Sequence, residues 1–105
     1  MTSVKFSVTN GKLTGFEISG HSSSSYKDEA GKIICSAVSS AAYMAANTLT
    51  EIIGAKVDAQ VEDGYMRVTL DDKIDESQVV LKGLRLHLNE LSAQYCKHIK
   101  VNPEV

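Results

Sequence analysis

Two stretches of the chain alternate apolar and polar residues, and a turn dipeptide interrupts each of them. Asn10-Gly11 divides the first stretch and Asp63-Gly64 divides the second, and both dipeptides are typical of the tight turn of a β-hairpin. Gly15 breaks the alternation after the first turn, which predicts a β-bulge there. The pattern therefore predicts two hairpins. The apolar positions that share a face of the second hairpin are Val57, Ala59, Val61, Met66, Val68 and Leu70.

A segment with apolar residues at helical spacing follows each hairpin. The first ends at Gly54, a typical C-cap residue. The second is expected to begin at Asp75, where Gln78 three residues later completes a capping-box pattern. A short strand over Ile99 to Val101 should follow, before Pro103. The first apolar stripe comprises Ile34, Val38, Ala41, Ala45, Leu49 and Ile52, and the second comprises Val80, Leu84, Leu88, Leu91 and Tyr95.

The expected order of elements is ββαββαβ. Strands with one apolar face and helices with one apolar stripe bury each other best in two layers. The pattern therefore predicts an α+β fold, a two-layer sandwich in which a mainly antiparallel sheet packs on two helices. A chain of 105 residues suits a single domain, residues 1–105, with one core.

Charge and composition narrow the possible partners. The formal net charge is −2 and no basic cluster is present, which argues against direct binding of nucleic acid. The sequence shows neither the apolar run of a signal peptide nor a segment that we expect to span a membrane. We therefore expect a cytoplasmic protein without a bound cofactor, in which Cys35 and Cys96 are thiols rather than a disulfide.

His21 and Cys35 are the candidate catalytic residues. His21 follows the first hairpin directly, and Cys35 falls in the first turns of the first predicted helix. There the helix dipole and the exposed amides favour a thiolate, which lowers a cysteine pKa from its usual value of about 8.5. His21 can act as the acid and base, while the amides of Cys35 and Ser36 are candidates to stabilise an oxyanion.

A polar loop, 22–30, separates the two candidates. Short polar side chains have little to bury, so we expect this loop to be mobile and to close over a bound peptide. Tyr43 and a tyrosine of the loop are candidates for the wall of the peptide pocket. The predicted substrate loop comprises Ser22, Ser23, Ser24, Ser25 and Tyr26.

The sequence supports a metal site or a redox function less well. Cys96 and His98 form a Cys-x-His pair that does not match the spacing of zinc ligands, so no metal site is expected. A thiol-redox protein is disfavoured because the chain has no Cys-x-x-Cys pair. His87 is expected on the side of the second helix in a structural role.

The segments FEISGH and GKIICSAVSSAAYMAANTL, with the hairpin and helix that follow, resemble the ribosomal-processing cysteine protease family Prp over essentially the whole chain. The family has a Gly-His pair, a mobile loop and then Gly-x-Asp-Ile-Val-Cys-Ala-Ala-Val-Ser at the start of a helix. Gly20-His21 and the run from Gly31 to Ser39 match the two ends of that pattern. The resemblance implies a His21/Cys35 dyad and removal of a short N-terminal extension from large-subunit ribosomal protein twenty-seven. It also implies a homodimer and a loop that becomes ordered on the substrate.

Lys32 is the main departure from the family pattern, which has aspartate at this position. A lysine cannot orient a histidine or cap the helix, although its charge would favour a Cys35 thiolate. We hypothesise that Asp28 or Glu29 supplies the missing carboxylate. The alternative is a module that binds the ribosomal protein and has lost protease activity.

Overall fold

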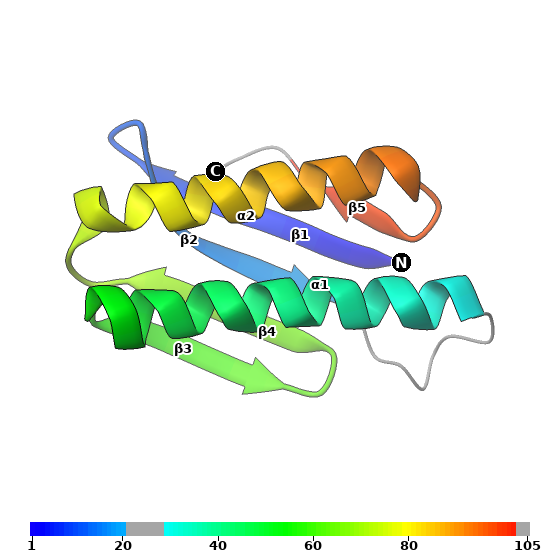
Figure 1. Cartoon of the computed structure of the whole chain (residues 1–105), viewed down its shortest axis with the longest axis horizontal. Helices are drawn as coiled ribbons and strands as arrows, with labels where there is room; N and C mark the ends of the chain where they lie inside the picture. Colours follow the sequence, from blue (N-terminus) through cyan, green and yellow to red (C-terminus); the bar gives the residue numbers. More distant parts are fainter. Residues whose placement is uncertain (21–28, 103–105) are drawn as a thin grey trace.

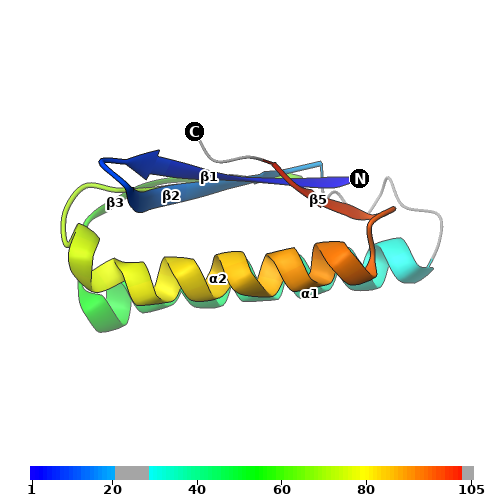
Figure 2. The ribbon, with the colours of Figure 1, turned by 90° about the horizontal axis from the view of Figure 1, so that it is seen from above.

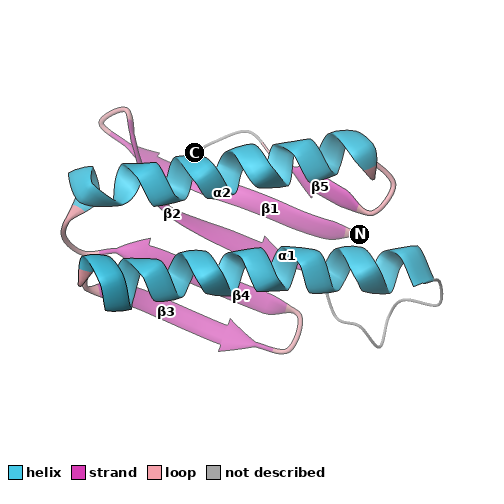
Figure 3. Cartoon of the chain, viewed as in Figure 1, coloured by secondary structure: helices cyan, strands magenta, loops and turns pink. Residues whose placement is uncertain are grey.

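The computed structural model describes residues 1–20 and 29–102, which form one sheet and one layer of helices (Figure 1). Seen from above, both helices lie on the same face of the sheet, which confirms the two-layer α+β fold (Figure 2). The chain order is β1 (Thr2–Thr9), β2 (Lys12–Ser19), α1 (Glu29–Asn47), η2 (Thr48–Ile53), β3 (Val57–Glu62), β4 (Tyr65–Leu70), α2 (Ile74–Gln94) and β5 (Ile99–Val101). Figure 3 distinguishes these helices and strands, in the expected order ββαββαβ with η2 continuing α1.

The strands pair in the order β3-β4-β2-β1-β5. Neighbouring strands are antiparallel except for β1 and β5, which are parallel. The two hairpins join through β2 and β4, where Phe16 lies opposite Val68. Within the described residues, the sheet therefore has β3 and β5 as its edges.

The first hairpin has the predicted turn and the predicted irregularity. Asn10 and Gly11 both have positive φ, at 53° and 76°, as a type I′ turn requires. Ser7 then pairs with Gly15 whereas Val8 pairs with Leu13, so β2 carries one extra residue beside Gly15. This bulge restores the alternation, and the apolar residues on both sides of it face the helices.

Along the second hairpin, the two strands share an apolar face but differ in burial. Met66 and Val68 on β4 are buried. Val61 and Ala59, which lie opposite them on β3 in that order, are exposed. Figure 1 shows β3 at the rim of the sheet, where its C-terminal end extends past α1. The helical layer therefore leaves an apolar strip of β3 accessible.

The first apolar stripe is correct except at its end. Ile34, Val38 and Leu49 are buried in the core, but Ile52 is exposed, so its predicted core position was wrong. Residues 48–53 form a π-helical turn, in which hydrogen bonds join residues five apart rather than four. The wider turn rotates Ile52 outward and brings Ile53 against the core. The helix ends as predicted at Gly54, which has a φ of 77°.

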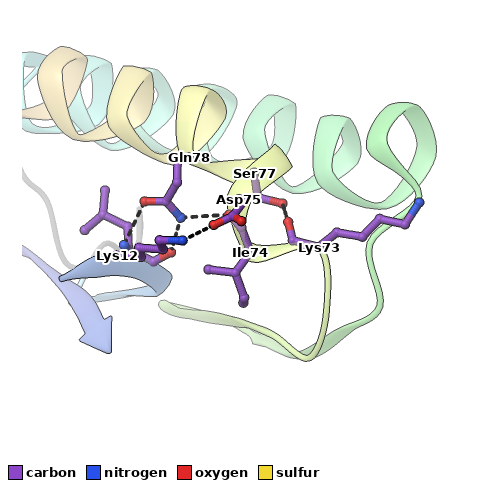
Figure 4. A network of polar contacts seen from close by, with 7 residues as sticks. Lys12, Lys73, Ile74, Asp75, Ser77 and Gln78 are labelled. Carbon is purple, nitrogen blue, oxygen red and sulfur yellow. Dashed lines mark hydrogen bonds and ion pairs between the residues drawn. The ribbon is translucent and has the colours of Figure 1, made fainter. Parts of the chain in front are cut away.

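Gln78 anchors the start of α2, but the predicted capping box was wrong. The helix begins at Ile74, and its N-cap residue, Lys73, makes no side-chain cap hydrogen bond. Gln78 bonds the first hairpin instead: its Nε2 donates to the carbonyl of Leu13 at 2.7 Å, and its Oε1 accepts from the Leu13 N–H at 2.9 Å (Figure 4). Pairing between β2 and β4 begins after Leu13, so the Gln78 amide takes the place of a strand there.

The second apolar stripe is shifted slightly from its prediction. Leu84 and Leu88 are buried as expected, and so is Leu81, which the pattern did not single out. Tyr95 was wrongly included, because it follows the last residue of α2 and is exposed. The two helices and the sheet thus enclose one continuous core.

Residues 29–53 have the length and hydropathy that would suffice to cross a membrane, judged by those two properties alone. From the sequence we expected no membrane-spanning segment and did not consider this helix as a candidate. A core helix passes the same test, and one face of this helix packs on the sheet.

Candidate active site

Cys35 lies in the second turn of α1, on the side of the helix that faces the β3–β4 hairpin. Its neighbours Ile34 and Val38 are inserted in the core and hold this face of the helix against the sheet. Cys35 is 7% exposed. The scaffold therefore holds the thiol in a defined position at the edge of the core.

An open groove of about 550 Å³ lies between α1 and the end of the β3–β4 hairpin. We call it the Cys35 groove. Helix residues form one wall, and the end of β3 with its turn forms the other. The residues that line it are Cys35, Ser36, Ser39, Tyr43, Val61, Glu62 and Asp63.

The described surroundings raise the pKa of Cys35, in contrast to the lowered pKa expected from the sequence. Burial is the main cause, since it penalises the charged thiolate, and the negative charge of Asp63 acts in the same direction. A hydrogen bond between the side chains of Ser39 and Cys35 opposes them and lowers the pKa. The argument from the sequence considered the helix dipole but could not anticipate the burial or the nearby carboxylate.

Two substitutions should move the Cys35 pKa in opposite directions. Ser39→Ala removes a hydrogen bond to the thiolate and should raise it, while Asp63→Asn removes a repulsive charge and should lower it. The measurement is the rate of alkylation by iodoacetamide against pH, in a Cys96→Ala background. The midpoint should move to higher pH in the first variant and to lower pH in the second. Glu62→Gln is the matched control, and equal midpoints in all variants would contradict this account.

The amides of Cys35 and Ser36 lie within the helix. Because α1 begins at Glu29, both follow its first four N–H groups, and an α-helix directs such amides to carbonyls four residues earlier. Their use as an oxyanion hole stays a prediction, and it requires the first turns of α1 to open.

His21, the proposed catalytic partner of Cys35, lies outside the described residues. The predicted substrate loop, residues 22–26, and Asp28 lie outside them as well. The described chain before them ends at Gly20, whose N–H donates to the carbonyl of Gly64 at 3.0 Å. That bond places Gly20 beside the turn that lines the Cys35 groove. Glu29 and Lys32 are both exposed in the first turn of α1.

The remaining candidate residues lie outside the Cys35 groove. Neither cysteine forms a disulfide, as expected, and Cys96 is exposed in the turn after α2. Among the residues that the structure describes, no group of three His, Cys, Asp or Glu side chains could hold a metal ion. His87 is exposed on α2 and lines a separate apolar groove between the two helices.

Sequence reasoning missed two parts of the groove. Ser39 follows Cys35 by one helical turn, a spacing that brings side chains together and could have revealed the pair. Val61 and Asp63 come from the second hairpin, and the sequence offered no signal of their distance from Cys35. Asp63 was recognised only as a turn residue.

A thiol beside an open groove, near the start of a helix on a small α+β scaffold, is an arrangement that a cysteine hydrolase needs. A model of the family described as cysteine protease Prp matches residues 1–100. The chain therefore belongs to this family and is a cysteine protease, as the resemblance implied. No curated protein matches the chain significantly.

Solved structures share the fold. The ribosomal processing protease Prp from S. aureus, in complex with a substrate peptide, matches with a TM-score of 0.89 and 21% identity over 100% of both chains. SMU.848 from Streptococcus mutans matches with a TM-score of 0.87 and 22% identity over 97% of this chain and 96% of that one. The S. aureus protease with a covalently linked product peptide gives a TM-score of 0.83 and 23% identity, again over 100% of both chains.

Proposed function

We propose that this protease removes a short N-terminal extension from large-subunit ribosomal protein twenty-seven, during ribosome maturation in the cytoplasm. One observation carries the proposal: in a chain of a cysteine protease family, Cys35 lines a groove that opens to solvent. The S. aureus protein of the same fold is a ribosomal processing protease that was solved with a substrate peptide. That likeness supports a peptide substrate from the ribosome.

In the proposed reaction, the Cys35 thiolate adds to the scissile carbonyl, and His21 donates a proton to the departing amine. Water then attacks the thioester, releases the carboxylate product and restores the thiol. The described surroundings raise the pKa of Cys35, so the proposal requires a positive charge that favours the thiolate. The imidazolium of His21 would supply it.

We propose that the carboxylate of Asp28 or Glu29 orients the His21 ring, since Lys32 has no carboxylate. Asp28→Asn or Glu29→Gln should then lower kcat by roughly tenfold or more, with less change in KM. Steady-state cleavage of a substrate peptide measures this. Unchanged kcat in both variants would remove the assignment. The loop 22–30 is proposed to become ordered over the peptide in the same complex.

The proposal is tested by incubating ribosomal protein twenty-seven from the same cell with the purified protease and measuring its intact mass. We expect the loss of one short N-terminal peptide, and its mass identifies the cleaved bond. An uncleaved ribosomal protein that nevertheless binds the chain tightly would favour the non-catalytic module instead.

We also propose that the protease is a homodimer, formed through the groove between α1 and α2. This groove has a volume of about 320 Å³, and Met44 and Val79 on its rim are 70% and 82% exposed. Small residues such as Ala41 and Gly83 line it, and we expect them to leave room for the Met44 of a second copy. Such self-complementarity is what a two-fold interface needs.

Met44→Glu should disrupt this dimer, because it places a charge in an apolar interface. We expect at least a roughly tenfold increase in the dimer dissociation constant, measured by sedimentation equilibrium. Leu86→Glu is the matched control, because Leu86 is an exposed apolar residue of α2 that does not line the groove. A monomeric wild type at micromolar concentration would contradict the proposal.

A further inference from the structure

β3 presents an accessible edge beside the thiol. One side of the strand pairs with β4, and within residues 1–20 and 29–102 no strand pairs with its other side. All of its residues after Val57 are exposed. An unpaired edge offers a row of N–H and C=O groups to which an extended chain can add as a further strand.

The edge leads directly into the Cys35 groove. Val61 and Glu62, the last two residues of β3, line the groove together with Cys35. An extended peptide added along β3 would therefore reach the groove that Cys35 lines. The other edge strand, β5, does not line this groove.

The groove also offers apolar contacts on one side of such a peptide. Val61 points to the helix side of the sheet, since it lies opposite the buried Met66. It is nevertheless 52% exposed, and Tyr43 on the facing wall is 48% exposed. Alternate side chains of an added strand would point into this space. An apolar side chain there would cover both residues.

The charges on β3 select the kind of strand that can pair with it. Asp58 and Glu62 are exposed on the strand, and Asp63 follows in the turn. Asp58 is ion-paired with Arg67 at 3.2 Å, so the negative charge beside the groove comes from Glu62 and Asp63. An acidic peptide would bring like charges against this end of the strand, so the edge favours a neutral or basic peptide.

We propose that the substrate binds as an added β-strand on the edge of β3, with an apolar side chain held between Val61 and Tyr43. The inference rests on the proposed function, because it takes Cys35 as the nucleophile. It adds the mode of recognition: an extended, non-acidic peptide whose backbone contributes affinity and whose alternate side chains contribute specificity.

A scan of N-methylated peptides tests this mode of binding. The probe is a peptide that spans the N-terminal extension of ribosomal protein twenty-seven, methylated at one backbone nitrogen at a time. Binding is measured by calorimetry with Cys35→Ala, which cannot cleave it. Because alternate amides of an added strand face β3, affinity should fall by about tenfold at every second position and change little between them. An effect without this alternation would overturn the proposal.

A protein variant tests the side-chain contact separately. Val61→Asp should raise the KM for the unmodified peptide by roughly tenfold with less effect on kcat, because it places a charge in the apolar contact. The matched control is Ile52→Asp, another exposed apolar residue, which lies outside the groove. Equal KM values for Val61→Asp and the wild type would contradict the contact.

The strand proposal and the proposed function fail in different ways. If the wild type cleaves the ribosomal protein but the methylation scan shows no alternation, only the mode of binding is wrong. If the wild type does not cleave it, the proposed function is wrong, whatever the scan shows.

Discussion

Replacement of Cys35 by alanine should abolish cleavage while the protein stays folded. The variant loses the nucleophile, and loss of a catalytic nucleophile lowers the rate by about 10⁴-fold or more in comparable hydrolases. The fold should tolerate the change, since Cys35 lies at the edge of the core and alanine is a good helix former. The measurement is kcat/KM for the substrate peptide, with circular dichroism to verify folding.

Cys96→Ala is the matched control for this result. It removes the other thiol of the chain, which is exposed and lies outside the Cys35 groove. We expect kcat/KM within about twofold of the wild type. If activity survived in Cys35→Ala but disappeared in Cys96→Ala, the nucleophile would be Cys96, and the assignment to the Cys35 groove would be wrong.

Gly15→Ala should strongly destabilise the protein. A Cβ at this position would lie 2.3 Å from the carbonyl oxygen of Val68, far inside van der Waals contact. β2 is paired on both sides, so neither neighbouring strand can move away without losing its own hydrogen bonds. We expect the free energy of unfolding to fall by about 3 kcal/mol, or folding to fail.

Urea denaturation measures this effect, and the midpoint should fall by roughly 1 M or more. Thr14→Ala places the same alanine one residue earlier on β2, where it shortens a half-buried side chain and creates no new contact. Its midpoint should stay much closer to the wild type. Similar midpoints for Gly15→Ala and the wild type would show that the bulge can absorb a methyl group.

Local patterns in the sequence predicted most of the fold because they depend on residues close together in the chain. Asn10-Gly11 gave the first turn, Gly15 indicated the bulge, and Gly54 marked the end of the first helix, all as the structure has them. Ile52 was misplaced because a π-helical turn changes the helical period, and no rule of spacing signals that change.

Contacts between distant segments explain the remaining errors. Gln78 has the spacing of a capping box, but β4 stops short of Leu13, and the Gln78 side chain bonds the Leu13 peptide groups that β4 does not reach. The Cys35 pKa likewise depends on burial and on Asp63, which the fold brings from the second hairpin. The pattern of residues identified the thiol, but only the packing reveals its environment.

The most direct test of the account is to label the nucleophile with an electrophile derived from the substrate. Once the cleaved bond is known, the extension peptide is prepared with a C-terminal chloromethyl ketone, whose chloride is displaced by a thiolate to leave a thioether. Digestion and mass spectrometry then locate the adduct. We predict one adduct per chain, on Cys35, and none in Cys35→Ala. An adduct on Cys96, or an unmodified wild type, would contradict the account.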